Sequence, residues 1–174
     1  MEKLGWHSLG TAFDCPCGVR HELPIEECYV GEDAAKHLAD FARECCGTRA
    51  LVLSDENTRA VGGEPGLSAL GTAGRQVTEK VYPGDPIEAT EELANEVAAA
   101  GQDGDFYVGI GGGTLSDLAK SAGDRQDKPV LLFPTAASMN GYTSAIVALK
   151  VRGLKATIPC QPAVGVFADP EVVA

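Results

Sequence analysis

Basic residues are scarce in this chain. Its 174 residues include 14 lysines and arginines against 25 aspartates and glutamates, which gives a formal net charge of −11 at pH 7. Nucleic acids and anionic membranes attract proteins through basic surface. The sequence therefore predicts that neither is a partner.

Long apolar runs are also missing. The N-terminal sequence MEKLGWHSLGTAF lacks the apolar core of about 7 to 15 residues that marks a secretory signal. No run approaches the roughly 18 apolar residues of a transmembrane helix. We therefore expect a cytoplasmic location, in which the six cysteines stay reduced rather than form a disulfide framework.

Histidine occurs three times, as His7, His21 and His37, all in the first quarter of the chain. His21 shares the segment DCPCGVRH with Cys15 and Cys17. Thiolate and imidazole are ligands that Zn²⁺ prefers, but a closed structural site needs four of them, and its cysteines are usually spaced C-x₂₋₄-C. Two interpretations stay open: a loop with free thiols, and a small structural metal site. In neither would the segment be a catalytic centre.

The length fits about one domain. Residues 1–26 are interpreted as an irregular N-terminal segment and residues 27–174 as one α/β domain. Strands are expected at 27–31, 49–54, 75–81, 106–110, 129–133 and 163–168, and helices at 32–46, 85–101 and 114–123. Strand and helix alternating in this way predict a Rossmann-like parallel sheet with helices on both faces.

Two segments of this pattern carry more specific predictions. Asp85 precedes Pro86 and stands three residues before Glu88, which predicts a helix start with Asp85 as N-cap and Glu88 completing a capping box. Residues 59–74 are rich in glycine and alanine with weak periodicity, so we expect a loop there with at most a short helix.

The stretch Asp105–Lys120 is the most informative part of the sequence. An apolar strand leads into Gly111, Gly112 and Gly113, then Thr114 and a helix. Glycine lets a ligand approach the backbone closely, and the first N–H groups of a helix favour anions. The stretch predicts a cradle for a diphosphate, with Asp117 facing the same crevice. The alternative is a tight turn with a capping residue and a solvated aspartate.

Two further strand ends carry polar residues. Asp55 follows the strand at 49–54, and residues 135–138 follow the strand at 129–133. In parallel sheets, ligands sit outside the carboxyl ends of the strands, and a carboxylate there can hold a ribose. The alternative for Asp55 is a turn in which the side chain bonds to its own backbone.

A hairpin is expected near the C-terminal end of the chain. Residues 144–150 and 155–159 flank Arg152-Gly153, which is a turn signal. The hairpin would let Lys155 reach back toward a phosphate.

The segments GIGGGTLSDLAK, LLFPTAASMNGYTS, GLKATIP and VFADPEVV follow one another in this order. Together they resemble the N-terminal domain of the glycerol-1-phosphate dehydrogenase branch of the dehydroquinate synthase-like and iron-containing alcohol dehydrogenase superfamily. The resemblance covers roughly residues 27–174. It implies a two-domain enzyme that binds NAD or NADP on this domain and Zn²⁺ on a helical second domain, which we expect to be absent from this chain.

The resemblance also implies a role for individual residues. Asp55 would contact the adenosine ribose, and the glycine turn with Asp117 would hold the pyrophosphate. The complete set of implied cofactor contacts is Asp55, Gly111, Gly112, Gly113, Asp117, Thr135, Ser138, Ser144 and Lys155.

The sequence departs from the family pattern at the substrate. Asn140 stands where these enzymes usually carry a substrate-contacting aspartate, and an amide lacks the charge of a carboxylate. The metal ligands of the family, one aspartate and two histidines, would lie beyond Ala174. Asp169 comes too early to be that aspartate, so no metal ligand of the family is expected in this chain.

The predicted function is therefore the NAD(P)-binding domain of a metal-dependent polyol-phosphate dehydrogenase that interconverts dihydroxyacetone phosphate and glycerol phosphate, with a small phosphorylated polyol or ketone as substrate. This chain by itself should bind the cofactor without turnover, and the resemblance suggests a homo-oligomer. The alternatives are a dehydroquinate synthase-like carbon–oxygen lyase domain and a non-catalytic nucleotide-binding module. Asp55 and Glu56 should repel a 2′-phosphate, whereas the nearby Arg59 could offset that repulsion, so NAD and NADP both stay open.

Overall fold

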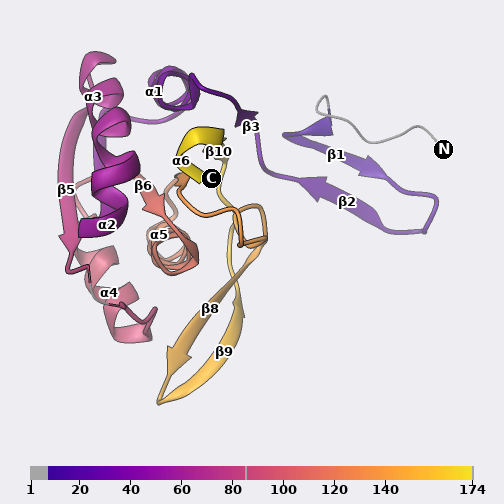
Figure 1. Cartoon of the computed structure of the whole chain (residues 1–174). Coiled ribbons are helices and arrows are strands. Elements are labelled where there is room, and N and C mark those ends of the chain that lie inside the picture. Colours follow the sequence, from indigo (N-terminus) through magenta and orange to yellow (C-terminus); the bar gives the residue numbers. More distant parts are fainter. Residues whose placement is uncertain (1–7, 85, 174) are drawn as a thin grey trace.

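The central element of the fold is a six-stranded sheet in the order β3-β10-β7-β6-β4-β5, in which each pair of neighbouring strands is parallel (Figure 1). The computed structural model describes residues 8–84 and 86–173. The sheet strands are β3 (Glu27–Val30), β4 (Arg49–Asp55), β5 (Gln76–Tyr82), β6 (Phe106–Gly111), β7 (Val130–Pro134) and β10 (Gly165–Ala168). The predicted Rossmann-like sheet is confirmed.

Helices cover both faces of this sheet. Helices α1 (Ala34–Cys45) and α3 (Glu64–Thr72) pack on one face, and α4 (Glu91–Ala100) and α5 (Gly113–Gln126) pack on the other. A short helix, α6 (Pro170–Val173), follows β10. None of the helices in the described part of the chain has the length and apolar character needed to cross a membrane.

Strand β4 shows why the sequence carries apolar runs here. Leu51 and Leu53 belong to the core on the α4–α5 face, whereas Ala50 and Val52 belong to the core on the α1–α3 face. Successive side chains of a strand point to opposite faces. Because both faces are covered by helices, the whole strand is apolar rather than alternating.

The direction in which the strands are added to the sheet reverses between β4 and β6. From β4 the chain moves outward to the edge strand β5, and then returns to form β6 on the opposite side of β4. In open α/β sheets, ligands bind outside the carboxyl ends of the strands at such a switch point. Asp55 ends β4 and Gly111 ends β6, so both predicted site residues lie at this edge of the sheet.

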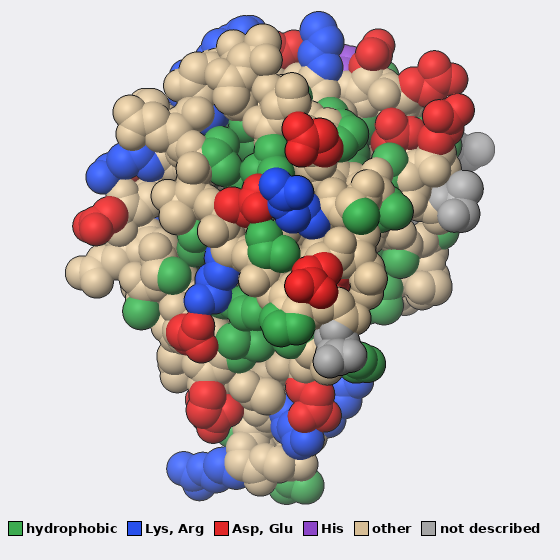
Figure 2. All heavy atoms as spheres, turned by 60° about the vertical axis from the view of Figure 1, so that its left-hand side comes forward, with side chains coloured by type: hydrophobic (Ala, Val, Ile, Leu, Met, Phe, Trp, Pro, Cys, Tyr) green, Lys and Arg blue, Asp and Glu red, His purple; other side chains and the backbone are tan. Residues whose placement is uncertain are grey.

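The exposed edge of the sheet carries charge. In Figure 2, acidic and basic side chains are interspersed over the face that includes α2, α3 and β5. Two ion pairs anchor β5 here: Glu79 binds Arg59 at 2.7 Å, and Lys80 binds Glu96 at 2.6 Å. Charged side chains on an edge strand discourage pairing with another chain.

The loop expected within residues 59–74 is wrong, although the short helix allowed for there is present as part of a longer helical segment. Helix α2 (Glu56–Thr58) leads into a π-helical turn (Arg59–Gly63) and then into α3, so the segment is helical up to Thr72. Leu70 is fully buried, and Gly62 packs against the side chains at the end of β7. Burial against the sheet therefore stabilises a helix that weak local periodicity does not predict.

The helix expected from residue 85 begins later. Asp85 lies outside the described residues, but α4 starts at Glu91 with Thr90 as its N-cap. The Glu88 carboxylate lies before this helix and pairs with the Lys150 ammonium at 2.7 Å. The Lys150 amide also donates to the Ala89 carbonyl at 2.8 Å. Contacts with Lys150 thus hold this segment in an extended conformation.

The predicted C-terminal hairpin is confirmed as β8 (Ile146–Val151) paired with β9 (Leu154–Pro159). Arg152 and Gly153 form its turn with φ of 50° and 82°, as two-residue hairpin turns require. The hairpin projects from the body of the molecule (Figure 1).

The N-terminal segment was expected to be irregular, but part of it is regular. Strands β1 (Thr11–Asp14) and β2 (Arg20–Leu23) form a second antiparallel hairpin. Its turn is made possible by Gly18, with φ of 85°. The hairpin extends away from the sheet (Figure 1). The domain boundary near residue 27 stays a prediction.

The start of α4 can be tested by mutation. The Thr90 side chain accepts a hydrogen bond from the Leu93 amide at 3.1 Å. Thr90→Ala should lower the free energy of unfolding by about 1 kcal/mol, measured by urea denaturation. Ser68→Ala, an exposed position within α3, is the control and should change it by less than about 0.5 kcal/mol. Equal effects would show that Thr90 is not the cap.

Candidate functional site

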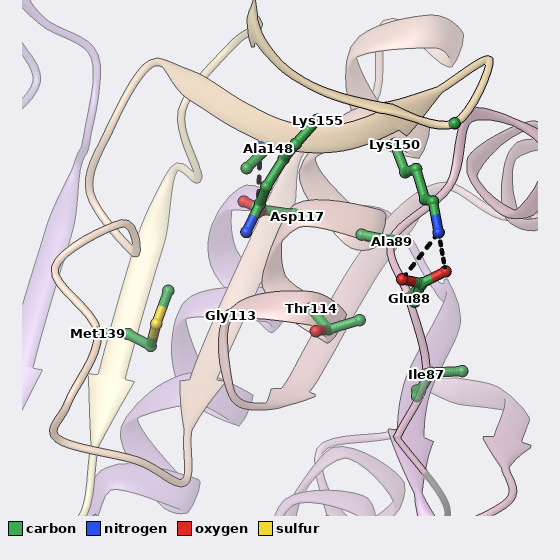
Figure 3. A pocket seen from close by; sticks show the side chains of 11 residues that line it. Ile87, Glu88, Ala89, Gly113, Thr114, Asp117, Met139, Ala148, Lys150 and Lys155 are labelled. Carbon is green, nitrogen blue, oxygen red and sulfur yellow. Dashed lines mark hydrogen bonds and ion pairs between the residues drawn. The ribbon is translucent and has the colours of Figure 1, made fainter.

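A cavity of about 470 Å³ lies at the N-terminus of α5, beneath the β8–β9 hairpin (Figure 3). Helix α5, the segment before α4, the β7–β8 loop and the hairpin all contribute to its wall. The lining residues are Ile87, Glu88, Ala89, Gly113, Thr114, Asp117, Met139, Ala148, Lys150, Gly153 and Lys155. Three of the predicted cofactor contacts, Gly113, Asp117 and Lys155, are among them.

The N-terminus of α5 is open toward ligands. Gly112 is the N-cap, and no side chain caps the helix. The first intrahelical hydrogen bond runs from the Ser116 amide to the Gly112 carbonyl at 3.1 Å. The preceding amides of the first turn have no partner inside the helix and carry the positive end of its dipole. This is the arrangement that binds phosphate groups in proteins.

The three glycines serve different purposes. Gly111 has a φ of 154°, and a Cβ there would run into Leu115, so the fold requires glycine. A Cβ on Gly113 would meet the side chain of Met139. At Gly112, however, a Cβ would meet nothing within 4 Å. Packing does not explain this glycine, whereas a ligand that closely approaches the backbone would.

Asp117 connects the floor of the cavity to the hairpin. Its Oδ2 accepts a hydrogen bond from the Ala148 amide of β8 at 3.1 Å. Burial raises the pKa of Asp117, an effect opposed by that hydrogen bond and by the positive charges of Lys120 and Lys155. In Figure 3 the Lys155 side chain points from the hairpin toward Asp117. The predicted crevice-facing aspartate is therefore not simply solvated.

Lys120 was not predicted from the sequence, yet it organises the region. It is fully buried, and its Nζ donates to the carbonyls of Gly141 and Ile146, each at 2.8 Å. A third contact is with the Ser144 hydroxyl at 3.3 Å. Burial lowers the pKa of Lys120, and the carboxylate of Asp117, 3.8 Å away, opposes this shift. Lys120 thus fixes the loop between β7 and β8.

A sequence signal for this lysine does exist. It stands three residues after Asp117, within an otherwise apolar helix stripe of Leu115, Leu118, Ala119 and Ala122. A charged residue in such a stripe is rarely buried unless it is paired. The Asp117–Lys120 spacing supplies that partner on the same helix face.

The structure gives Asp55 a local bonding role. Its Oδ1 accepts a hydrogen bond from the Thr58 amide at 2.7 Å, and the Thr58 hydroxyl accepts from the Asp55 amide at 3.0 Å. This capping box matches the turn interpretation. A contact of Asp55 with ribose stays a prediction.

The remaining predicted residues lie in the β7–β8 loop. The Thr135 amide donates to the Gly111 carbonyl at 3.2 Å, which ties this loop to the glycine turn. Ser144 takes part in the hydrogen bonds around Lys120. Ser138 and Asn140 are exposed and flank Met139, whose side chain reaches Gly113. Ser138, Asn140 and Ser144 do not line the cavity.

The side chains of this cavity do not form a three-ligand metal site. Asp117 and Glu88 are its acidic residues, and no histidine or cysteine lines it. Within residues 8–84 and 86–173, one group of three metal-ligating side chains occurs, Cys15, Cys17 and His21, and it lies on the β1–β2 hairpin. There, a hydrogen bond with His21 is the main cause that lowers the pKa of Cys17 to about 7.

Comparisons with a family model and with named relatives both point to one group of dehydrogenases. The model of the family described as iron-containing alcohol dehydrogenase matches residues 29–174. A protein of Bacillus velezensis named glycerol-1-phosphate dehydrogenase (NAD(P)+) is 27% identical over 98% of this chain and 44% of its own length. Proteins of the same name from Geobacillus stearothermophilus and Methanothrix thermoacetophila are 30% and 33% identical, over 95% and 87% of this chain and 42% of each relative. The chain spans less than half of these relatives.

Solved structures share the fold. A glycerol dehydrogenase from Schizosaccharomyces pombe superimposes with a TM-score of 0.73 at 24% identity, covering 84% of this chain and 38% of its own. A 1,3-propanediol oxidoreductase superimposes with a TM-score of 0.76 at 18% identity, covering 84% of this chain and 44% of its own. At these identities the likeness shows the fold alone.

The structural role of Lys120 can be measured. Lys120→Met should lower the free energy of unfolding by about 3 kcal/mol, because it leaves Asp117 buried without its cation and the loop carbonyls without a donor. Urea denaturation measures this, and limited proteolysis should cut the loop between β7 and β8 faster. Lys36→Met, at an exposed ion pair on α1, should cost less than about 1 kcal/mol. A Lys120→Met chain as stable as this control would contradict the assignment.

Proposed function

This chain belongs to the iron-containing alcohol dehydrogenase family, and on that basis we propose that it binds a nicotinamide dinucleotide, NAD or NADP, across the carboxyl ends of β4 and β6. The observation that carries the proposal is the uncapped N-terminus of α5, where Gly112 leaves the space beside the backbone open. The resemblance to the glycerol-1-phosphate dehydrogenase branch, noted from the sequence, agrees with the names of the relatives.

The electrostatics of the cavity suit a diphosphate. The backbone amides at the start of α5 offer hydrogen bonds and a positive dipole end to the phosphate oxygens. Lys155 lines the same cavity and adds a cation, and Lys150 and Lys155 together balance the charge of the two lining carboxylates, Glu88 and Asp117. This local arrangement can attract an anion even though the chain has a net charge of −11. We propose that Gly111, Gly112, Gly113 and Lys155 contact the pyrophosphate.

The dinucleotide, when bound, would supply hydride transfer at its nicotinamide ring. The residues of this chain bind and orient it. Asp117 holds the hairpin over the cavity through the Ala148 amide, and Lys120 fixes the loop that carries Thr135, Ser138 and Ser144. We propose that these loop residues contact the cofactor and that Asp55 contacts its adenosine ribose.

The proposed reaction is the oxidation of a small phosphorylated polyol or the reduction of the matching ketone, as in the relatives named glycerol-1-phosphate dehydrogenase. We propose that Asn140 contacts the substrate. Its side chain is exposed on the β7–β8 loop and is therefore accessible to a ligand. The Zn²⁺ expected from the resemblance stays a prediction for the part of the relatives that this chain does not span. The cytoplasmic location and the homo-oligomer likewise stay predictions. The two alternative functions, a carbon–oxygen lyase domain and a non-catalytic nucleotide-binding module, stay open.

Gly112→Ala tests the proposed cradle. The backbone of Gly112 has φ of −81°, which alanine adopts, and its Cβ would meet nothing within 4 Å, so the melting temperature should not change. The methyl group would stand where a phosphate oxygen approaches the amides. We expect the dissociation constants of NAD⁺ and NADP⁺, measured by titration calorimetry, to rise by at least about tenfold, or about 1.4 kcal/mol.

The matched control is Gly71→Ala, because a Cβ at this α3 position also meets nothing within 4 Å and the position is outside the cavity. Its affinity for both dinucleotides should equal that of the unmodified chain. Unchanged affinity in Gly112→Ala would contradict the proposed cradle.

The choice between NAD and NADP turns on Arg59. Its Nε pairs with the Glu79 carboxylate at 2.7 Å, which favours NAD because the arginine is already neutralised. Glu79→Gln should release Arg59 and tighten NADP⁺ binding relative to NAD⁺ by a few-fold, whereas the double variant with Arg59→Ala should lose that gain. Measured dissociation constants that keep the same ratio in all three chains would contradict a role for Arg59.

A further inference from the structure

The turn of the β1–β2 hairpin gathers three metal-ligating side chains. Strand pairing places His21 opposite Phe13, and the chain turns back between Cys15 and Val19. Two backbone hydrogen bonds shape this turn: the Gly18 amide donates to the Cys15 carbonyl at 2.9 Å, and the Cys15 amide donates to the Val19 carbonyl at 3.1 Å. As a result, Cys15, Cys17 and His21 converge at one end of the hairpin.

The spacing of the ligand atoms is close to that of a metal site. The sulfur atoms of Cys15 and Cys17 and a ring nitrogen of His21 all lie within 4.8 Å of one another. The Cys17 Sγ and His21 Nε2 are 3.2 Å apart. With Zn–S and Zn–N bonds of about 2.0 to 2.3 Å, the ligand atoms of a tetrahedral site lie roughly 3 to 4 Å apart. Small side-chain rotations would bring all three atoms onto one ion.

The hairpin has little else to stabilise it. Both strands are four residues long, and most of their side chains are exposed. An isolated two-stranded hairpin is marginally stable in water. The ion pair between Arg20 and Asp14 is exposed and contributes little. A structural metal is a common staple for such a small element.

We propose that Cys15, Cys17 and His21 bind one Zn²⁺-like thiophilic divalent cation, with the fourth position taken by water or a further donor. On binding, each of the two thiols gives its proton to solvent, and His21 binds through a neutral ring nitrogen. Cys28 packs against the core from β3 and does not belong to the group. His7 lies outside the described residues.

This site is separate from the proposed cofactor cavity. None of its three ligands lines that cavity. Its role would be to hold the N-terminal hairpin in shape, not to polarise a substrate. The spacing C-x-C-x₃-H differs from the usual C-x₂₋₄-C of zinc sites, but the tight turn brings the three ligand atoms within 4.8 Å of one another.

The experiment uses the whole chain, reduced and stripped of metal with a chelator, and titrates it with Co²⁺ and then Zn²⁺. The expected result is one equivalent of Co²⁺ with thiolate-to-cobalt charge-transfer absorption, which Zn²⁺ then displaces. Cys15→Ser and Cys17→Ser should abolish the charge-transfer absorption. His21→Ala should weaken binding by more than about tenfold, the least that even an outer-shell partner typically costs. The control Cys45→Ser, at an exposed thiol on α1, should bind as the unmodified chain does.

A second readout follows the hairpin itself. Hydrogen exchange at residues 11–23 should slow when Zn²⁺ is added, whereas exchange in β6 should stay unchanged. Because Cys17 is exposed, the metal-free Cys17→Ser chain should melt at the same temperature as the metal-free unmodified chain, so the variant is a fair test. The proposal would be overturned by stoichiometric binding that survives Cys17→Ser, or by the lack of charge-transfer absorption in the unmodified chain.

Discussion

The open N-terminus of α5 is the constraint on which the site depends. A helix that starts directly after a buried parallel strand must turn sharply, and Gly111 permits this turn with φ of 154°. The turn leaves the first amides of α5 without a capping side chain at the switch point of the sheet. A ligand with hydrogen-bond acceptors can pair with these amides, which otherwise bond only to water.

The rest of the region supports that turn. Lys120 and Asp117, on one face of α5, fix the β7–β8 loop and the β8–β9 hairpin respectively. Thr135 joins the same loop to Gly111 through backbone hydrogen bonding. One helix therefore positions two neighbouring segments, and its buried charges are satisfied mainly by backbone groups rather than by solvent.

Much of the fold could be predicted from the sequence, because in most segments the local residue pattern favours the same structure as the tertiary packing. Apolar runs such as residues 49–54 and 129–133 mark strands that are covered on both faces, and the Arg152-Gly153 turn signal marks the hairpin. The two wrong secondary-structure predictions have their causes in tertiary contacts. The helix after β4 depends on burial of Leu70, and residues 86–90 are held extended by Lys150, contacts that a local window does not contain.

The placement of some residues around the candidate site also followed from the sequence, for the same reason. Gly113, Asp117 and Lys155 meet at one cavity, as their strand-end and hairpin positions suggested. Lys120, Met139 and the Glu88–Lys150 pair were missed, because their roles arise from segments 20 to 60 or so residues away in the chain. Asp55 is the opposite case: its place at a strand end predicts a ribose contact, whereas in the structure its carboxylate accepts a hydrogen bond from the Thr58 amide.

The most direct measurement of the central claim is a titration of the ¹⁵N-labelled chain with NAD⁺ and NADP⁺, followed amide by amide. We expect the largest chemical-shift changes at the amides of Gly112, Gly113 and Thr114, at the start of α5. Saturable changes elsewhere with these three amides unmoved, or no change at millimolar dinucleotide, would contradict the central claim.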